Sequence, residues 1–426
     1  MRHAEVCTPT QNYVPHVSAM IRMQSLPLFR SRYSQMTAGG LPHKVSPHGV
    51  HRCHPQAVAD PIAFPLPVLH QSIMTRAPVT CENNVNEYKV VLETSSGNFY
   101  EIGRMLRETI YGQVIHAIEL IRGEDGHLSR KSPINQLAIK IYSNERLRTL
   151  KKKTQENPSS EIAAMQFIGK HRHIVGQIEC CRDKNNVYSI MEFADGGELF
   201  DYIDQEGPIN EDCAREMFSQ ILLGLMHLHD AGIAHRDLTL ENIMCSRSGI
   251  CKLIDFGMSL RLPRVPDSQS ISRENEVQND QSRPVMNIPP QGTCGKPNYI
   301  APEVMKNTED FNPQLSDIWS LGVMLFIMLT GVPPVAVAYD LDDRYRVICE
   351  GGLEAILIQW DFHLSSDAVN LLNNLLRPHP QERLTVKEII DHPWTRKRNP
   401  LIVKMTRDRQ DMIYDDWGIP LTSTIK

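Results

Sequence analysis

The pattern of apolar and polar positions becomes regular from about residue 98 and first predicts strands. Residues 100–106 and 113–120 have the pattern of two strands joined as a hairpin, and residues 136–142 and 187–192 have the pattern of further strands. We therefore expect a small antiparallel sheet in the first part of this regular region.

Helical spacing of apolar residues marks one segment inside the strand-rich part and most of the chain after it. Residues 159–169 are predicted as a helix, with Ser159 or Ser160 as its N-cap. A strand-rich part followed by a helix-rich part predicts an α+β fold in two lobes, and a cleft between lobes is a common ligand site. The later segments with helical spacing are 211–229, 321–330 and 368–376.

The first 97 residues differ from the rest and are predicted to be a mostly disordered extension. Residues 1–80 contain seven Arg or Lys but only Glu5 and Asp60 as acids, so their net charge is +5 and that of the remainder is −10. They show no sustained periodicity, which favours disorder. An organellar transit peptide is an alternative that we do not favour. The same holds for a zinc site at the clustered His48, His51, Cys53 and His54.

Composition indicates a mostly globular protein without a nucleic-acid or membrane partner. The formal net charge of −5 gives no sign of nucleic-acid binding. The apolar run at residues 321–329 is far shorter than a membrane span. The ten cysteines lack paired spacing, which favours reduced thiols. We expect a cytoplasmic protein, with the nucleus as the alternative.

A lysine within a predicted strand is the first candidate for chemistry. Lys140 follows Ala138 and Ile139, and it needs a carboxylate to hold its side chain in place. Glu161, on the predicted helix that follows, is the matching candidate. Such a pair can neutralise the phosphates of a nucleotide, although a lone strand lysine is more often a solvated edge residue.

The strongest signal is the run HRDLTLEN at residues 235–242, hereafter the catalytic loop, with Asp255-Phe256-Gly257 thirteen residues after its end. In this pattern Asp237 accepts or orients the proton of an attacking hydroxyl group. The side-chain oxygens of Asn242 and Asp255 are suited to hold Mg²⁺.

Two further pairings are expected around this loop. Glu303, in Ala301-Pro302-Glu303, needs a buried partner, and Arg383 is the candidate because a buried carboxylate alone is costly. Asp317 stands at the start of an apolar helix, where it can accept backbone N–H bonds from the catalytic loop.

Together these motifs resemble a complete eukaryotic protein kinase domain of the serine/threonine type, from about residue 100 to residue 394. The runs GGELF at residues 196–200 and HPW at residues 392–394 are similar to the calcium/calmodulin-dependent and energy-sensing branch. The resemblance implies ATP and Mg²⁺ as cofactors and a protein substrate. It implies catalytic roles for Lys140, Glu161, Asp237, Asn242 and Asp255, with Asn242 and Asp255 as the metal ligands, and nucleotide contacts for Leu106, Gly112, Val114, Ala138, Lys140, Met191, Glu192, Ala194, Glu198 and Met244.

The sequence departs from the family at the glycine-rich loop. Where three glycines are usual, residues 107–114 read RETIYGQV, and Gly112 alone remains. Missing glycines put side chains where backbone amides would approach the phosphates, so a weaker grip on ATP is expected. Arg107 can compensate with its charge or can simply face solvent, and we favour the second interpretation.

A second departure concerns two side chains that meet beside the catalytic Asp in the family. Thr239 stands where the family has Lys, and Lys296 stands where it has Thr. We hypothesise that the two have been exchanged and that Lys296 reaches Asp237 and the γ-phosphate from the activation segment, residues 255–303.

The activation segment is long, and its regulation is the third departure. Arg236 calls for a nearby anion, which phosphorylation supplies in many kinases, and Thr293 is the nearest hydroxyl. An upstream activating kinase is therefore a candidate partner, although Glu274 or Glu276 could serve instead.

We expect residues 1–97 to be an extension, residues 98–394 to be the kinase domain and residues 395–426 to be a tail. The lobes are expected to meet between residues 193 and 194. The predicted function is an active serine/threonine kinase. The alternative is a weak or inactive pseudokinase that acts as a scaffold. Glu198 and Glu241 suggest a mild preference for substrates with basic residues.

Overall fold

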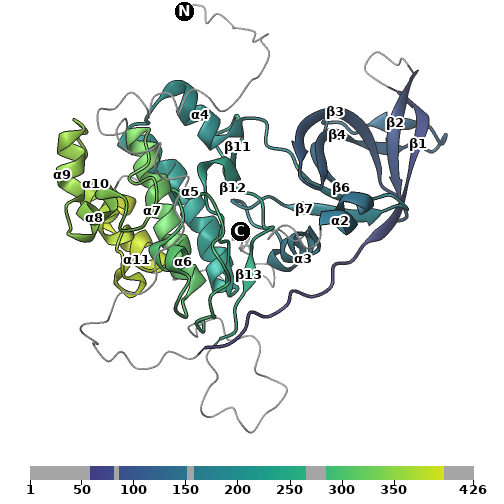
Figure 1. Cartoon of the computed structure of the whole chain (residues 1–426). Helices are drawn as coiled ribbons and strands as arrows, with labels where there is room; N and C mark the ends of the chain where they lie inside the picture. Colours follow the sequence, from purple (N-terminus) through teal and green to yellow (C-terminus); the bar gives the residue numbers. More distant parts are fainter. Residues whose placement is uncertain (1–57, 81–85, 151–157, 265–284, 398–426) are drawn as a thin grey trace, which may run out of the picture. The chain divides into compact units, whose positions relative to one another are not determined.

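The computed structural model describes residues 58–80, 86–150, 158–264 and 285–397 of the chain. All of these residues belong to one unit, Gln56–Lys426. Within this unit a strand-rich part precedes a helical part, as Figure 1 shows. The predicted α+β class is confirmed.

Eight strands of the first part form one sheet that closes on itself (Figure 1). Paired neighbours follow the ring β1-β2-β3-β4-β6-β8-β7 and return to β1, while the short β5 lies between β4 and β1. The pairings are antiparallel except for those of β1 with β5 and β7. The strands are β1 (His70–Thr80), β2 (Asn86–Thr94), β3 (Phe99–Thr109), β4 (Gly112–Arg122), β5 (Leu128–Arg130), β6 (Gln136–Ser143), β7 (Gln177–Arg182) and β8 (Asn186–Glu192).

Two of these strands lie where the sequence analysis predicts disorder. Strands β1 and β2 pair over nine residue positions, and β2 continues into β3 through a tight turn. Val91 and Leu92 of β2 are buried in the ring. The prediction that the domain starts at residue 98 is therefore wrong, because its sheet already includes residue 70. The His- and Pro-rich composition of the preceding residues obscured the short β-rich pattern of this pair.

A buried carboxylate of β7 holds the turn of the β2–β3 hairpin. Glu179 accepts hydrogen bonds from Tyr100 Oη at 2.9 Å, from Asn98 Nδ2 at 2.9 Å and from Ser96 Oγ. Burial opposes the charge of Glu179, but these donors together hold its pKa below the usual range. The turn of the hairpin is thus anchored to β7 by the hydrogen bonds that Glu179 accepts.

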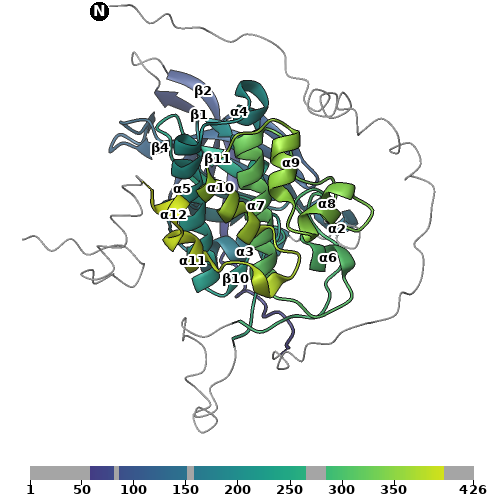
Figure 2. The ribbon, with the colours of Figure 1, turned by 90° about the vertical axis from the view of Figure 1, so that its left-hand side faces the viewer.

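The second part of the unit consists mainly of helices, and Figure 2 shows them grouped together. Short strands precede and follow the catalytic loop: β10 (Ile233–Ala234), β11 (Ile243–Cys245), β12 (Cys251–Leu253) and β13 (Leu260–Arg261), with β9 (Gly197–Glu198) beside β11. The helices are α2 (Asn144–Leu150), α3 (Pro158–Ile168), α4 (Leu199–Glu206), α5 (Glu211–Asp230), α6 (Pro302–Lys306), α7 (Pro313–Thr330), α8 (Asp343–Cys349), α9 (Leu353–Gln359), α10 (Ser366–Leu375), α11 (Val386–Asp391) and α12 (Pro393–Arg396), with turns of 3₁₀ helix at Leu240–Asn242 and Pro380–Glu382.

Helix α7 is the central apolar element of this part. It begins at Pro313, where the Asn312 side chain caps it by accepting the backbone N–H of Gln314. It ends at Thr330 and is followed by the C-cap Gly331, with φ 76°. Among the described helices it alone is long and apolar enough to cross a membrane, yet 83% of it is buried. This is the arrangement of a core helix.

Residues 58–68 form an extended segment, hereafter the N-terminal strap, that joins α3 to the start of the activation segment. The backbone of Val68 exchanges hydrogen bonds of 2.9 Å and 3.0 Å with the side chain of Gln166 on α3. The rings of Phe64 and Phe167 pack edge to face at 5.9 Å. Ile62 forms a β-bridge with Arg261 of β13. The sequence analysis did not predict this segment.

Candidate active site

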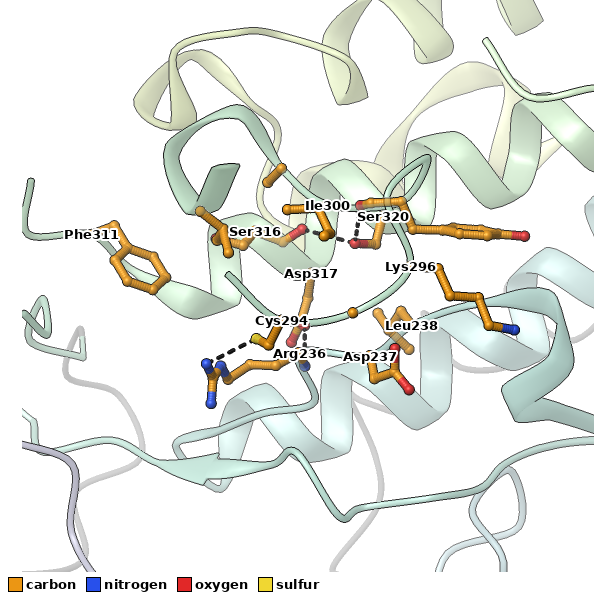
Figure 3. Close-up of a pocket in the computed structure, with 14 residues that line it drawn as sticks. Arg236, Asp237, Leu238, Cys294, Lys296, Ile300, Phe311, Ser316, Asp317 and Ser320 are labelled. Atoms are coloured by element: carbon orange, nitrogen blue, oxygen red, sulfur yellow. Dashed lines mark hydrogen bonds between the residues drawn. The ribbon is translucent and has the colours of Figure 1, made fainter. Parts of the chain in front are cut away.

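A turn of left-handed backbone presents Asp237, and Asp317 of α7 holds that turn. Arg236 has φ 67°, a region that non-glycine residues rarely adopt. Asp317 accepts the backbone N–H of His235 at 2.9 Å and that of Arg236 at 2.8 Å, as Figure 3 illustrates for Arg236. His229 Nε2 lies 3.0 Å from the same carboxylate. The prediction that Asp317 binds the backbone of the catalytic loop is confirmed.

The side chains of Asp237 and Asn242 are joined directly. Asn242 Nδ2 donates to the backbone oxygen of Asp237 at 2.8 Å and to its Oδ2 at 2.9 Å. Burial raises the pKa of Asp237, and the charge of Asp255 adds to this effect. A carboxylate with a raised pKa is a better proton acceptor than an exposed one.

Asp255 follows β12 in a left-handed conformation with φ 62°. Its Oδ1 accepts the backbone N–H of Gly257 at 3.2 Å. Burial opposes its charge, but Lys140 and the Gly257 N–H lower its pKa below the usual range. The next side chain, Phe256, is fully buried and lies against His235 with ring centroids 5.2 Å apart. Asp255 is thus held as an anion beside a packed aromatic pair.

The predicted Lys140–Glu161 pair is present between β6 and α3. Lys140 Nζ lies 2.6 Å from Glu161 Oε1, and the two side chains are 16% and 7% exposed. Burial raises the pKa of Glu161, although Lys140 opposes this. Ser159 and Ser160 lie inside the first turn of α3, which begins at Pro158, so their prediction as N-caps is wrong.

The residues expected to bind the nucleotide lie on strands that pair with one another. Val114 of β4 is opposite Lys140 of β6, and Ala138 of β6 is opposite Met191 of β8. Met244 of β11 is opposite Glu198 of β9. The remaining members of the set are Leu106 on β3, Gly112 on β4, Glu192 at the end of β8 and Ala194 in the segment that follows.

A comparison with protein families gives a match to the protein kinase domain over residues 127–395, which is more than half of the chain. The chain belongs to the protein kinase family. The match begins after β4, so it excludes the hairpin in which the glycines are missing.

Curated relatives of this kinase carry names from one group of plant enzymes. CBL-interacting protein kinase 17 of Oryza sativa subsp. japonica is 34% identical over 318 residues, which cover 74% of this chain and 60% of the relative. CBL-interacting serine/threonine-protein kinase 9 of Arabidopsis thaliana is 31% identical over 325 residues, which cover 76% of this chain and 63% of the relative. The chain thus spans about three fifths of the length of these relatives, and the serine/threonine type in the name of the Arabidopsis relative agrees with the resemblance seen in the sequence.

Two features of the β3–β4 hairpin distinguish it from the glycine-rich loop that is usual in the family. A Cβ at Gly112 would lie 2.0 Å from the backbone oxygen of Ile141, so the close approach of β4 to β6 already requires this glycine. Arg107 Nη1 lies 2.7 Å from Glu198 Oε1, although the Arg107 side chain is 63% exposed. Arg107 is therefore partly in solvent, as favoured, but it is also paired with Glu198, one of the residues expected to contact the nucleotide.

Lys296 reaches the catalytic loop of the kinase, but its closest partner is Glu241. Lys296 Nζ lies 2.7 Å from Glu241 Oε1. Lys296 and Asp237 line the same small pocket (Figure 3). The charge of Lys296 opposes the rise in the pKa of Asp237 that burial causes. Thr239 is fully buried, and its hydroxyl oxygen has no hydrogen-bond partner among the described residues.

Among the described residues, the side chain of Arg236 contacts a sulfur atom and a backbone oxygen. Arg236 Nη2 donates to Cys294 Sγ at 2.9 Å (Figure 3). Its Nη1 donates to the backbone oxygen of Met258 at 3.3 Å. Sequence reasoning singled out Thr293, the exposed neighbour of Cys294, and missed this contact. The only signal for the Arg236–Cys294 contact in the sequence was that Cys294 directly follows Thr293. Glu274, Glu276 and the cluster of His48 to His54 lie outside the described residues.

The predicted support around the activation segment is present. Arg383 donates two hydrogen bonds of 2.7 Å to the carboxylate of Glu303, and its side chain is fully buried. A bidentate pair of this kind fixes both position and orientation. The end of the activation segment is therefore tied to the helical part.

Proposed function

We propose that this kinase is active and transfers the γ-phosphate of ATP to a serine or threonine hydroxyl of a protein. The observation that carries the proposal is the union of three chain segments at one site. The Lys140–Glu161 pair joins β6 to α3, the Asp237–Asn242 pair belongs to the catalytic loop, and the Asp255 carboxylate lies in the segment after β12. Each charged side chain has a partner that holds it in place, as catalysis by positioning of the reacting groups requires.

The donor atoms fit Mg²⁺ and ATP. Asp255 retains its negative charge, and Asn242, whose NH₂ group is bound to Asp237, has a carbonyl oxygen to offer. Oxygen donors of these two kinds are those that Mg²⁺ prefers. When bound, Mg-ATP supplies the phosphoryl group and a divalent charge to offset its oxygens. In this proposal the backbone of Glu192 and Ala194 binds adenine, and Leu106, Val114, Ala138, Met191 and Met244 surround it.

The roles of the protein groups follow from their partners. Asp237 accepts the proton of the substrate hydroxyl, for which its raised pKa suits it. Lys140, held by Glu161, neutralises phosphate charge. Lys296, which Glu241 holds beside Asp237, supplies positive charge near the acceptor. This geometry supports the exchange hypothesis in a modified form, because Lys296 reaches the site through Glu241.

Protein partners are part of the proposal. The relatives are named for interaction with CBL, so we propose that this chain also binds a regulatory protein. An upstream kinase that modifies the exposed Thr293 would place a phosphate one residue from the Cys294–Arg236 contact. Glu198 is already paired with Arg107, and Glu241 is already paired with Lys296. The expected preference for basic substrates should therefore be weak.

The decisive experiment is phosphate transfer from radiolabelled ATP by the full chain, to itself and to a generic basic protein. We expect transfer by the wild type and none by Asp237→Asn. Asp391→Asn makes the same chemical change at the exposed end of α11 and should be as active as the wild type. Absence of transfer from the wild type, even after treatment with an activating kinase, would contradict the proposal.

A pseudokinase scaffold is the second candidate, and the loss of glycines from the β3–β4 hairpin favours it. The absent glycines weaken the expected grip on the nucleotide. Binding of ATP without any transfer would support the scaffold.

A further inference from the structure

Two cysteines of the strands that follow the catalytic loop face each other. Cys245 ends β11 and Cys251 begins β12, and the two are direct partners in the antiparallel register. Their sulfur atoms are 3.6 Å apart. The sequence analysis could not find this pair, because the register of the hairpin is needed to bring the residues together.

The backbone hydrogen bonds show which kind of cross-strand pair this is. The Cys251 N–H donates to Gln220 Oε1 at 3.0 Å, and the Cys251 carbonyl oxygen accepts from His173 Nδ1 at 3.1 Å. The Cys245 carbonyl oxygen accepts the Gly196 N–H at 2.9 Å. The two cysteines therefore form a non-hydrogen-bonded pair, in which opposite Cα atoms are about 4.5 Å apart and side chains are closest. This separation lies within the range of about 4.4–6.8 Å seen for disulfides.

We propose that Cys245 and Cys251 form a reversible disulfide when the protein meets a peroxide. The Cys245 thiolate attacks one peroxide oxygen, the O–O bond breaks, and Cys245 becomes a sulfenic acid as water leaves. The Cys251 sulfur then attacks the Cys245 sulfur, the S–S bond forms, and the S–O bond breaks to release a second water. Two thiols lose two electrons and two protons in total, and the peroxide is reduced to water.

The order of the two steps follows from the environments of the two thiols. Cys245 is partly exposed, whereas Cys251 is 1% exposed. The contact with Cys251 lowers the pKa of Cys245, while the same contact and burial raise the pKa of Cys251. Cys245 is thus the accessible nucleophile and Cys251 the resolving thiol.

The location gives the bond a consequence for the site. The cross-linked pair lies three residues after Asn242 and four residues before Asp255. The disulfide would therefore join covalently the two strands that lie between Asn242 and Asp255, the proposed Mg²⁺ ligands. The proposal does not depend on whether the kinase is active.

The first test maps the bond in the full chain after treatment with hydrogen peroxide. Trypsin cleaves after Arg247, between the two cysteines, so the disulfide holds together two peptides that dithiothreitol separates. We expect these linked peptides in the mass spectrum of the oxidised protein and their loss on reduction. Cys245 and Cys251 that stay as free thiols, while the exposed Cys213 and Cys349 are oxidised, would overturn the proposal.

The second test uses the asymmetry of the pair. In Cys251→Ala the Cys245 sulfenic acid has no resolving thiol and should be labelled by dimedone. In Cys245→Ala the buried Cys251 should remain unlabelled, and Cys213→Ala should form the disulfide as the wild type does. Equal labelling of Cys245 and Cys251 in the two single variants would contradict the assigned order.

Discussion

The catalytic loop and the β3–β4 hairpin are held in opposite ways. The loop rests on a buried carboxylate, Asp317, which binds two consecutive backbone N–H groups. The hairpin is anchored at its base by Glu179, but its tip is secured by the exposed Arg107, paired with Glu198. The group proposed to accept the proton is therefore fixed by buried bonds, whereas the grip on the nucleotide depends on a solvated side chain. Substitutions in the two regions should differ in size and kind.

The largest effect is expected at Asp317. Asp317→Ala leaves the buried N–H groups of His235 and Arg236 without an acceptor, at a cost of roughly 1–3 kcal/mol each. The left-handed turn at Arg236 then loses its support, and we expect phosphate transfer to fall by about 100-fold or more. Unfolding by denaturant and the rate of transfer measure the two effects.

Asp317→Asn is the matched variant, because it keeps one acceptor oxygen. We expect it to recover part of the stability. If Asp317→Ala were as active as the wild type, the difference between the two regions would have no functional meaning.

The next effect concerns Lys296 at the edge of the catalytic loop. Lys296→Thr removes the cation beside Asp237 and should lower kcat by about tenfold. The double change Thr239→Lys with Lys296→Thr should restore part of the rate, because the charge returns from the other side. Lys296→Arg, which keeps the charge, is the control. Full activity of Lys296→Thr would rule out the exchange.

At the hairpin tip the effect should be smaller and should fall on nucleotide affinity. Arg107→Ala should raise the KM for ATP several-fold and leave kcat within about twofold. Arg104→Ala, an exposed change on the same strand, should leave both unchanged. A lower KM in Arg107→Ala would show instead that Arg107 competes with the nucleotide for Glu198.

The smallest effect on phosphate transfer is expected at the base of the hairpin, where the change is one of stability and should depend on pH. The folded-state pKa of Glu179 is lowered, so its carboxylate stabilises the fold above about pH 4.3, the value of an unfolded Glu. That stabilisation is lost as the pH falls through the lowered folded-state pKa. Glu179→Gln should therefore reduce the free energy of unfolding by roughly 1–3 kcal/mol at pH 7 and by less in acid. Glu93→Gln, a half-exposed change on β2, should show no such pH dependence.

The sequence predicted the parts of the site that lie in short, continuous motifs. The catalytic loop and Asp255 lie in short motifs whose spacing is fixed by the strands between them. The cost of an unpaired buried carboxylate pointed to the partner of Glu303, and the position of Asp317 in its helix pointed to the backbone of the catalytic loop. The contacts that escaped prediction join distant positions. Arg107 and Glu198 are 91 residues apart, and Arg236 and Cys294 are 58 residues apart. No local pattern encodes such side-chain meetings.

The strands β1 and β2 escaped prediction for a related reason. Their pattern is short and follows a long stretch without periodicity, and their stability comes from pairing with β3, β5 and β7. Tertiary pairing of this kind outweighs weak local preference. The N-terminal strap is likewise defined by its contacts with Gln166 and Arg261.

The closed ring of strands also limits how other proteins can bind to the strand-rich part of the chain. An open sheet exposes a row of backbone N–H and C=O groups to which an extended peptide can add itself, and such edges also promote aggregation. In the described residues β1 has β2 on one side and β7 and β5 on the other, so most of that edge is already occupied by the chain itself. A partner that recognises this part of the chain must therefore bind its side chains, and strand addition is disfavoured as a route to either assembly or aggregation.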